Sequence, residues 1–98
     1  MRKDTGRTRK IGELLQRELA TMIPREVGDP RAAKVTITAV DVAPDLSNAR
    51  VYVTHLAGEA QAEKAVTALN HAAGFLRHAL MKRVVLRHVP DLRFMYDA

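Results

Sequence analysis

The sequence predicts an α+β fold in which helices cover one face of a small three-stranded mixed sheet. Two segments, residues 8–23 and 59–83, repeat apolar side chains at helical spacing. Short runs rich in β-branched or aromatic residues lie between these segments and again at residues 92–96. The chain has 98 residues, 47% of them hydrophobic, which suits a single domain with a modest core. We therefore expect a flexible basic N-terminus over residues 1–7 and one domain over residues 8–98.

The first helix is expected to begin near Thr8 and to end at Ile23, because Pro24 follows. One apolar stripe runs along this helix and consists of Ile11, Leu14, Leu15, Leu19, Met22 and Ile23. Residues 24–33 contain Gly-Asp-Pro and are expected to form a loop.

Two strands are expected next, at about residues 34–42 and 49–56, with a turn at residues 43–48. The second strand alternates cleanly, with Val51 and Val53 on the inner face. The alternation of the first strand slips near Ala39, which indicates either a bulge there or a strand buried on both faces. Because the connection is short, the two strands should form an antiparallel hairpin.

The second helical segment, residues 59–83, keeps one apolar face along its length. This face consists of Ala62, Val66, Leu69, Ala73, Leu76 and Leu80. A straight helix of this length would span about 37 Å, which is long for a domain with a radius of gyration of about 13 Å. We therefore expect a kink near Gly74. The third strand is expected at residues 92–96, parallel to the second because a helix connects them, and residues 84–89 are left open between strand and loop.

Positive charge is distributed unevenly along the chain, which holds 16 basic and 11 acidic residues for a net charge of +5. Residues 64–90 contain no acid, and their five basic residues are Lys64, Arg77, Lys82, Arg83 and Arg87. Residues 1–10 hold five Lys or Arg side chains against Asp4 alone. Two basic clusters on a balanced background predict a polyanion as partner, and we prefer this interpretation to a chance bias of the solvated surface.

Gly74 lies within the acid-free stretch, in a helix interior where glycine costs about 1 kcal/mol relative to alanine. One explanation is that the bare backbone of Ala72, Ala73 and Gly74 admits a phosphate to the N–H groups freed by a kink. The other is that small residues let the helix pack closely on the sheet. The sequence favours neither explanation.

Three motifs occur in a fixed order along nearly the whole chain. "GDPR" follows a basic, leucine-rich helix, "VTITAVDVAPDLSNARVYVT" forms the hairpin, and "AAGFLRHALMKRVVLRHVPDLRFMYD" comes last. Together they resemble the ribosome-binding factor A family over about residues 7–97. The resemblance implies a KH-like fold of the type II arrangement, α-β-β-α(kink)α-β. It also implies an Ala-x-Gly kink, matched by Ala72-Ala73-Gly74, in place of the Gly-x-x-Gly loop of ordinary KH domains. Many family members continue past the last strand with a polar tail, whereas this sequence stops at Ala98.

The resemblance further implies a function. Members of this family bind the free or immature small (30S) ribosomal subunit and assist late maturation of 16S rRNA, including 5′-end processing, notably in the cold. We therefore expect a monomeric, cytoplasmic RNA-binding protein that is not an enzyme. We expect no cofactor, metal, membrane or small-molecule partner. The alternative is a generic KH-like RNA-binding protein without a ribosomal role.

The expected RNA contacts come from both basic clusters and from the kink. The first rank consists of Arg77, Lys82, Arg83 and Arg87, together with Ala72, Ala73 and Gly74. The second rank, which could instead favour solubility, consists of Arg7, Arg9 and Lys10. Aromatic residues make up 4% of the chain, so recognition of RNA shape and backbone is expected rather than a base-stacking platform.

Other function classes find less support in the sequence. Ser47 and His55 have no evident acid partner for a catalytic triad, and the absence of cysteine excludes thiol chemistry. His71 and His78 would lie two helical turns, about 10 Å, apart, which is too far to share one metal ion. A strand hairpin followed by one long crossover does not fit a helix-turn-helix DNA-binding domain. A protein-interaction module would bind its partner with much less dependence on salt.

Overall fold

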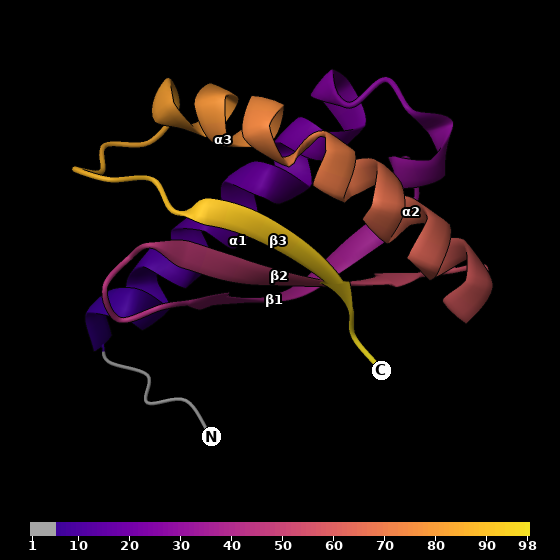
Figure 1. Cartoon of the computed structure of the whole chain (residues 1–98), viewed down its shortest axis with the longest axis horizontal. Helices are drawn as coiled ribbons and strands as arrows, with labels where there is room; N and C mark the ends of the chain where they lie inside the picture. The colour runs from indigo at the N-terminus through magenta and orange to yellow at the C-terminus, as the bar shows by residue number, and fades with distance from the viewer. Residues whose placement is uncertain (1–5) are drawn as a thin grey trace.

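The computed structural model describes residues 6–98, which form a three-stranded sheet in the order β1-β2-β3 with all three α-helices on one face (Figure 1). The elements in chain order are α1 (Gly6–Glu26), the 3-10 turn η1 (Pro30–Ala32), β1 (Val35–Val42), β2 (Asn48–His55), α2 (Glu59–His71), α3 (Ala73–Met81) and β3 (Asp91–Tyr96). The predicted α+β class and the element order of a KH-like type II arrangement are confirmed. Residues 1–5, part of the predicted N-terminal segment, lie outside the described residues, and the predicted division of the chain stays a prediction.

The hairpin and the parallel third strand form as predicted, since β1 pairs antiparallel with β2 and β2 pairs parallel with β3. The register of β1 shifts between Ile37 and Ala39, which confirms the bulge. Because one face of β1 is exposed, the alternative of a strand buried on both faces is wrong. Gln16 of α1 donates its side-chain N–H to Ile37 O at 3.1 Å, next to the bulge.

The core lies between the inner face of the sheet and the helices. Its largest fully buried side chains are Phe94, Leu15, Leu19, Met22, Leu69, Leu76, Leu80, Val51 and Val53. Gly12 of α1 is buried against β1, where a Cβ atom would lie 2.6 Å from Val40 O. Such a contact is shorter than van der Waals packing allows, so only glycine lets α1 approach the sheet this closely.

Helix α1 is longer than predicted at both ends. It begins at Gly6 rather than Thr8 and runs through Pro24 to Glu26. Pro24 has no N–H to donate, but Val27 N still bonds to Ile23 O at 3.2 Å, so the last turn is retained. The expected loop over residues 24–33 is therefore shorter than predicted and contains η1.

The second helical segment divides into α2 and α3, which confirms a kink but moves it to Ala72, two residues before Gly74. Ala72 has φ −92° and ψ 2°, outside the helical region, while Gly74 is helical and lies in the first turn of α3. The longest dimension of the protein is 33 Å, shorter than the about 37 Å of an unbroken helix. Residues 84–89, left open by the sequence, form a loop, and the third strand starts at Asp91.

Asn70 holds the end of α2 against the free edge of β3. Its side-chain N–H donates to Phe94 O at 3.0 Å, and its side-chain oxygen accepts from Phe94 N at 2.8 Å. These two bonds satisfy backbone groups at the edge of the sheet and hold α2 on β3 two residues before the break at Ala72.

Candidate nucleic-acid interface

The break at Ala72 leaves the N-terminus of α3 uncapped. We call residues 72–75 the α2–α3 junction. No side chain caps the N-terminus of α3, and Leu76 N, at 2.9 Å, bonds back to Ala72 O. The first N–H groups of a helix lack intrahelical partners, and together with the helix dipole they favour an anion. Gly74 is exposed, and a Cβ atom built there would have no neighbour within 4 Å. Close packing therefore does not require this glycine, and of the two explanations the geometry favours access to the backbone.

Arg83, a predicted first-rank contact, is held by acids from another part of the sequence. Its Nε lies 2.9 Å from Glu18 Oε1, and another of its nitrogens lies 4.0 Å from Glu26 Oε2. Both glutamates belong to α1, so this pair of contacts connects α1 with the end of α3. Although residues 64–90 contain no acid in sequence, the fold therefore places two glutamates of α1 beside Arg83.

Arg77 is also engaged, since it donates to Val89 O at 2.8 Å and lies 3.5 Å from Asp91 Oδ1. Lys82 and Arg87, by contrast, are exposed and form no ion pair with any other residue in the range 6–98. The structure thus divides the predicted first-rank residues into two paired arginines and two free cations. Their contacts with RNA stay a prediction.

The exposed side of α3 also carries apolar side chains. Phe75, next to Gly74, is 53% exposed, and so is Met81. Phe75, His78 and Lys82 line a cavity of about 260 Å³, together with Ala79 and the paired side chains of Arg83 and Glu26. The α2–α3 junction therefore offers an exposed ring as well as bare backbone.

The "GDPR" motif packs beside α2 and orients one more cation. Asp29 accepts from Arg31 N at 2.9 Å and holds the Arg31 side chain through contacts of 2.6–3.1 Å. The hydrogen bonds from Arg31 lower the pKa of Asp29 from 3.8 to about 2, and the charge of nearby His71, at the end of α2, acts in the same direction. The side chain of Arg31 is 45% exposed. The sequence prediction did not include Arg31, although an Asp immediately before Pro is a typical cap. Its ion pair with Asp29 places Arg31 with the engaged arginines rather than with the free cations.

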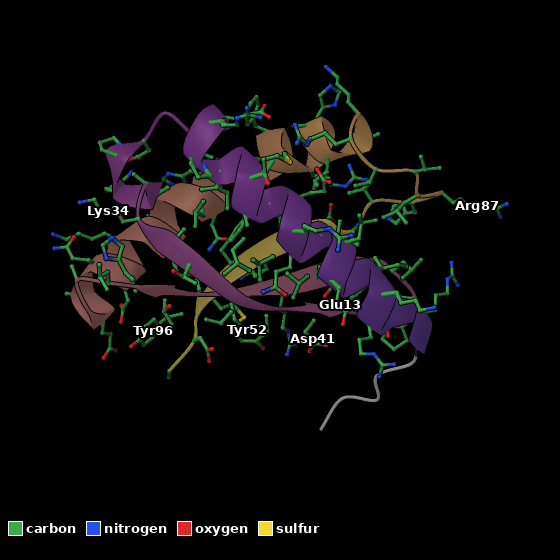
Figure 2. The ribbon with its side chains drawn as sticks, turned by 180° about the vertical axis from the view of Figure 1, so that it is seen from behind. Glu13, Lys34, Asp41, Tyr52, Arg87 and Tyr96 are labelled. Atoms are coloured by element: carbon green, nitrogen blue, oxygen red, sulfur yellow. The ribbon has the colours of Figure 1, made fainter. Side chains whose placement is uncertain are left out.

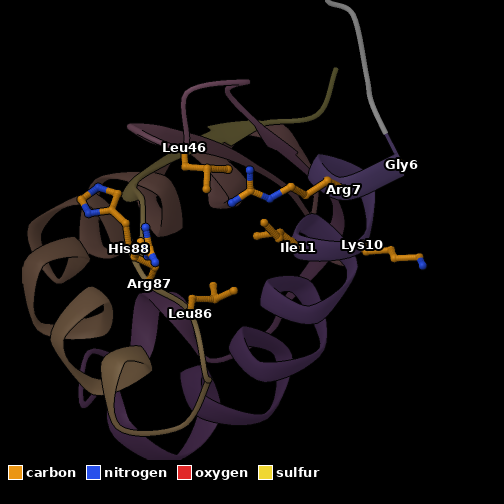
Figure 3. Close-up of a pocket in the computed structure, with 8 residues that line it drawn as sticks. All are labelled: Gly6, Arg7, Lys10, Ile11, Leu46, Leu86, Arg87 and His88. Atoms are coloured by element: carbon orange, nitrogen blue, oxygen red, sulfur yellow. The ribbon is translucent and has the colours of Figure 1, made fainter.

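Two of the second-rank residues lie near a first-rank residue at a cavity away from the α2–α3 junction. Arg7 and Lys10 of α1 line a cavity of about 610 Å³ together with Arg87 of the α3–β3 loop (Figure 3). Figure 2 shows Arg87 at one end of the protein, far from Lys34 at the other. Arg9 is exposed and does not line the cavity. The structure therefore joins the two basic clusters of the sequence, but at this cavity and not at the α2–α3 junction.

The groups that this surface offers are cations and backbone donors. Within residues 6–98 no group of three or more His, Asp or Glu side chains is placed to hold a metal ion. The ring of His55 accepts from Ala57 N at 3.0 Å, and Ser47 bonds to Asp45 in its own turn. In the same range no helix combines the length and the apolar character that a membrane span requires.

Comparison with known proteins agrees with this picture. The family model described as ribosome-binding factor A matches residues 7–98. Proteins named ribosome-binding factor A are 48% identical in Nitrosococcus oceani, over 99% of this chain and 76% of that protein, and 50% identical in Azotobacter vinelandii, over 100% and 78%.

Solved structures give the same result. The crystal structure of ribosome-binding factor A from Thermus thermophilus matches with a TM-score of 0.78 and 35% identity, covering 91% of this chain and 94% of that one. A homology model of the Thermus thermophilus factor, as fitted into the cryo-electron-microscopy map of its 30S complex, matches with a TM-score of 0.62 and 34% identity, over 84% of this chain and 90% of that one. The fold, the order of the motifs and these matches together place the chain in the ribosome-binding factor A family.

Proposed function

We propose that this protein binds the free or immature small (30S) ribosomal subunit and assists late maturation of 16S rRNA, including processing of its 5′ end, without itself catalysing a reaction. Membership of the family and the likeness to coordinates fitted into a 30S complex support this partner. We further propose that it acts as a monomer in the cytoplasm and needs no cofactor.

The observation that carries the proposal is the α2–α3 junction. An exposed glycine at an uncapped helix start lets a phosphate reach backbone N–H groups that a larger side chain would cover. Lys82 lies at the other end of α3, as its C-cap residue, and forms no ion pair within the described part of the chain. Contacts of this kind recognise an RNA backbone held in a particular shape, and their strength should fall steeply with salt.

The α2–α3 junction can be tested by placing one carboxylate on it. Gly74→Asp puts an acid in the first turn of α3, where the helix dipole favours it and where open space receives the side chain. Folding should therefore be unharmed, while an approaching phosphate is repelled. Ala60→Asp is the matched control, because Ala60 is exposed and is the second residue of α2 as Gly74 is of α3.

The measurement is co-sedimentation with purified small subunits at low and moderate salt. Wild type and Ala60→Asp should pellet with the subunits, and Gly74→Asp should remain in the supernatant. Arg77 and Arg83 stay intact in this design, because their replacement would disturb ion pairs within the protein. Equal pelleting of the two Asp variants would remove the α2–α3 junction from the interface. A wild type that binds unrelated structured RNA as well as it binds subunits would favour a generic RNA-binding protein instead.

A further inference from the structure

The cavity described above combines two kinds of wall. Three segments form it: the start of α1, the β1–β2 turn and the α3–β3 loop. Its apolar wall consists of Ile11, Leu46 and Leu86, and its basic side chains are Arg7, Lys10, Arg87 and His88. At about 610 Å³ it falls within the range of about 300–1,000 Å³ that is usual for small-ligand sites.

The side chains are directed so that charge and apolar surface meet at the same opening (Figure 3). Arg7 reaches from α1 across the opening toward Leu46, and Arg87 and His88 stand on the opposite side, whereas the amino group of Lys10 points away. No Asp or Glu from residues 6–98 lines the cavity. Neither Arg7 nor Arg87 forms an ion pair within that range, so both guanidinium groups are available to a ligand.

Asp45, in the β1–β2 turn beside Leu46, is bonded within its own turn. Asp45 lies close enough to His88 for the two charges to interact. Its carboxylate accepts from Ser47 N at 3.0 Å and from Ser47 Oγ at 2.7 Å, and these bonds lower the pKa of Asp45. Asp45 therefore stabilises its own turn and does not neutralise the arginines.

The same turn holds Leu46 in an unusual conformation. Leu46 has a φ of 63°, and no other residue except glycine in the range 6–98 has a positive φ. A bulky side chain adopts this conformation only at a cost, and here the bond from Leu46 N to Ala43 O at 2.8 Å helps to maintain it. The result is an apolar side chain presented to the opening between Arg7 and His88.

We infer that this cavity binds one unpaired nucleotide of an RNA strand. The base and sugar would lie against Ile11, Leu46 and Leu86, and the phosphate would lie between Arg7 and Arg87. A paired nucleotide cannot enter, because its base is stacked within a duplex, whereas an unpaired one can turn its base outward. No polar group on the apolar wall reads base edges, so binding is sequence-tolerant. The inference rests on the proposed function for its choice of RNA over an acidic protein.

The test follows backbone amide signals of the isotopically labelled full chain by NMR. The probes are a five-nucleotide single-stranded RNA, the same RNA as a duplex, and an acidic peptide of equal charge. We expect the single strand to shift the amides of residues 45–47 and 86–88, and the other two probes to leave them in place.

Two double variants separate the cavity from general charge. Arg7→Ala/Arg87→Ala removes the two converging arginines, and affinity for the single strand should fall by about tenfold or more. Arg17→Ala/Arg25→Ala removes two arginines of α1 that are also exposed but line no part of the cavity, and it should change affinity little. Leu46→Asn removes one apolar side chain of the wall and replaces it with a residue that tolerates the positive φ. The affinity for the single strand should fall several-fold, and any weak affinity for the duplex should stay unchanged.

Three results would overturn the inference: equal loss in the two arginine variants, equal shifts with the duplex, or equal shifts with the peptide. These results are distinct from failure of the ribosomal role. If the protein still pellets with small subunits but the single strand shifts no amide at the cavity, only the inferred nucleotide site is wrong. If the single strand shifts the amides at the cavity but the protein does not pellet with small subunits, only the proposed ribosomal role is wrong.

Discussion

Two helical glycines mark a packed region and an open region of this protein. Gly12 lies where α1 presses on β1, and a Cβ atom there would be 2.6 Å from a backbone oxygen. Gly74 lies at the α2–α3 junction, where a Cβ atom would meet nothing within 4 Å. The same residue type therefore serves packing in one helix and leaves backbone exposed in the other.

The basic side chains divide in the same way. Arg83 links the end of α3 to α1 through its bond to Glu18. Lys82, its neighbour in sequence, is exposed and forms no ion pair within residues 6–98. Adjacent residues of one basic run thus have different roles. A glycine or a cation therefore indicates a binding surface only where the surrounding fold leaves it unoccupied.

Gly12→Ala should have the largest effect on stability. The added methyl group meets the carbonyl of Val40, and relief requires moving α1 away from β1. We expect the free energy of unfolding to fall by about 1–3 kcal/mol, measured by urea denaturation. Unchanged stability would show that the two elements separate easily, and the contrast between the glycines would disappear.

Arg83→Ala should come next. It leaves Glu18 and Glu26, both partly buried, without their shared cation, and the free energy of unfolding should fall by about 1 kcal/mol. Subunit binding should change less than it does in Lys82→Ala, which removes a free cation and should leave the urea midpoint unchanged. The reverse ranking in the co-sedimentation assay would place Arg83 on the interface and break the division proposed here.

Gly74→Ala should act in the opposite direction on stability. Alanine suits a helix better than glycine, and the open space accepts its methyl group, so unfolding should become harder by up to about 1 kcal/mol. Binding to small subunits should weaken, because the methyl group covers backbone that a phosphate approaches. A variant that is both more stable and equally active would show that the exposed backbone is not used.

The smallest effect concerns the Asp29–Arg31 pair, which lies on the surface. The pKa of Asp29 in the folded protein is about 2, below its ordinary value of 3.8. Its contribution to stability is therefore present above pH 3.8 and is lost as the pH falls toward 2. Asp29→Asn should flatten this part of a plot of thermal midpoint against pH, and an unchanged slope would mean that the pair does not persist in solution.

Much of the fold follows from local patterns. Alternation in β2, the slip at Ala39 and the apolar stripe of α1 predicted the hairpin, its bulge and the packed helix face. The kink followed from length alone, since an unbroken helix of about 37 Å does not fit a domain of this size. Its placement at Ala72 rather than Gly74 could not be predicted, because glycine tolerates helical dihedral angles and the end of α2 bonds through Asn70 to a strand distant in sequence.

The α+β class and the order of the elements could be read from the amino-acid sequence, because hydrophobic periodicity and turn residues act over short stretches of chain. The family followed from the resemblance of three ordered motifs to known members. The positions of the basic residues and of the small residues around Gly74 were equally plain. Which of these residues are free depends on the folded arrangement. Ion pairing acts through space, so α1 supplies acids to Arg83 that its own stretch of sequence lacks. In the same way the fold brings Arg7 and Arg87, from opposite ends of the chain, to the rim of one cavity.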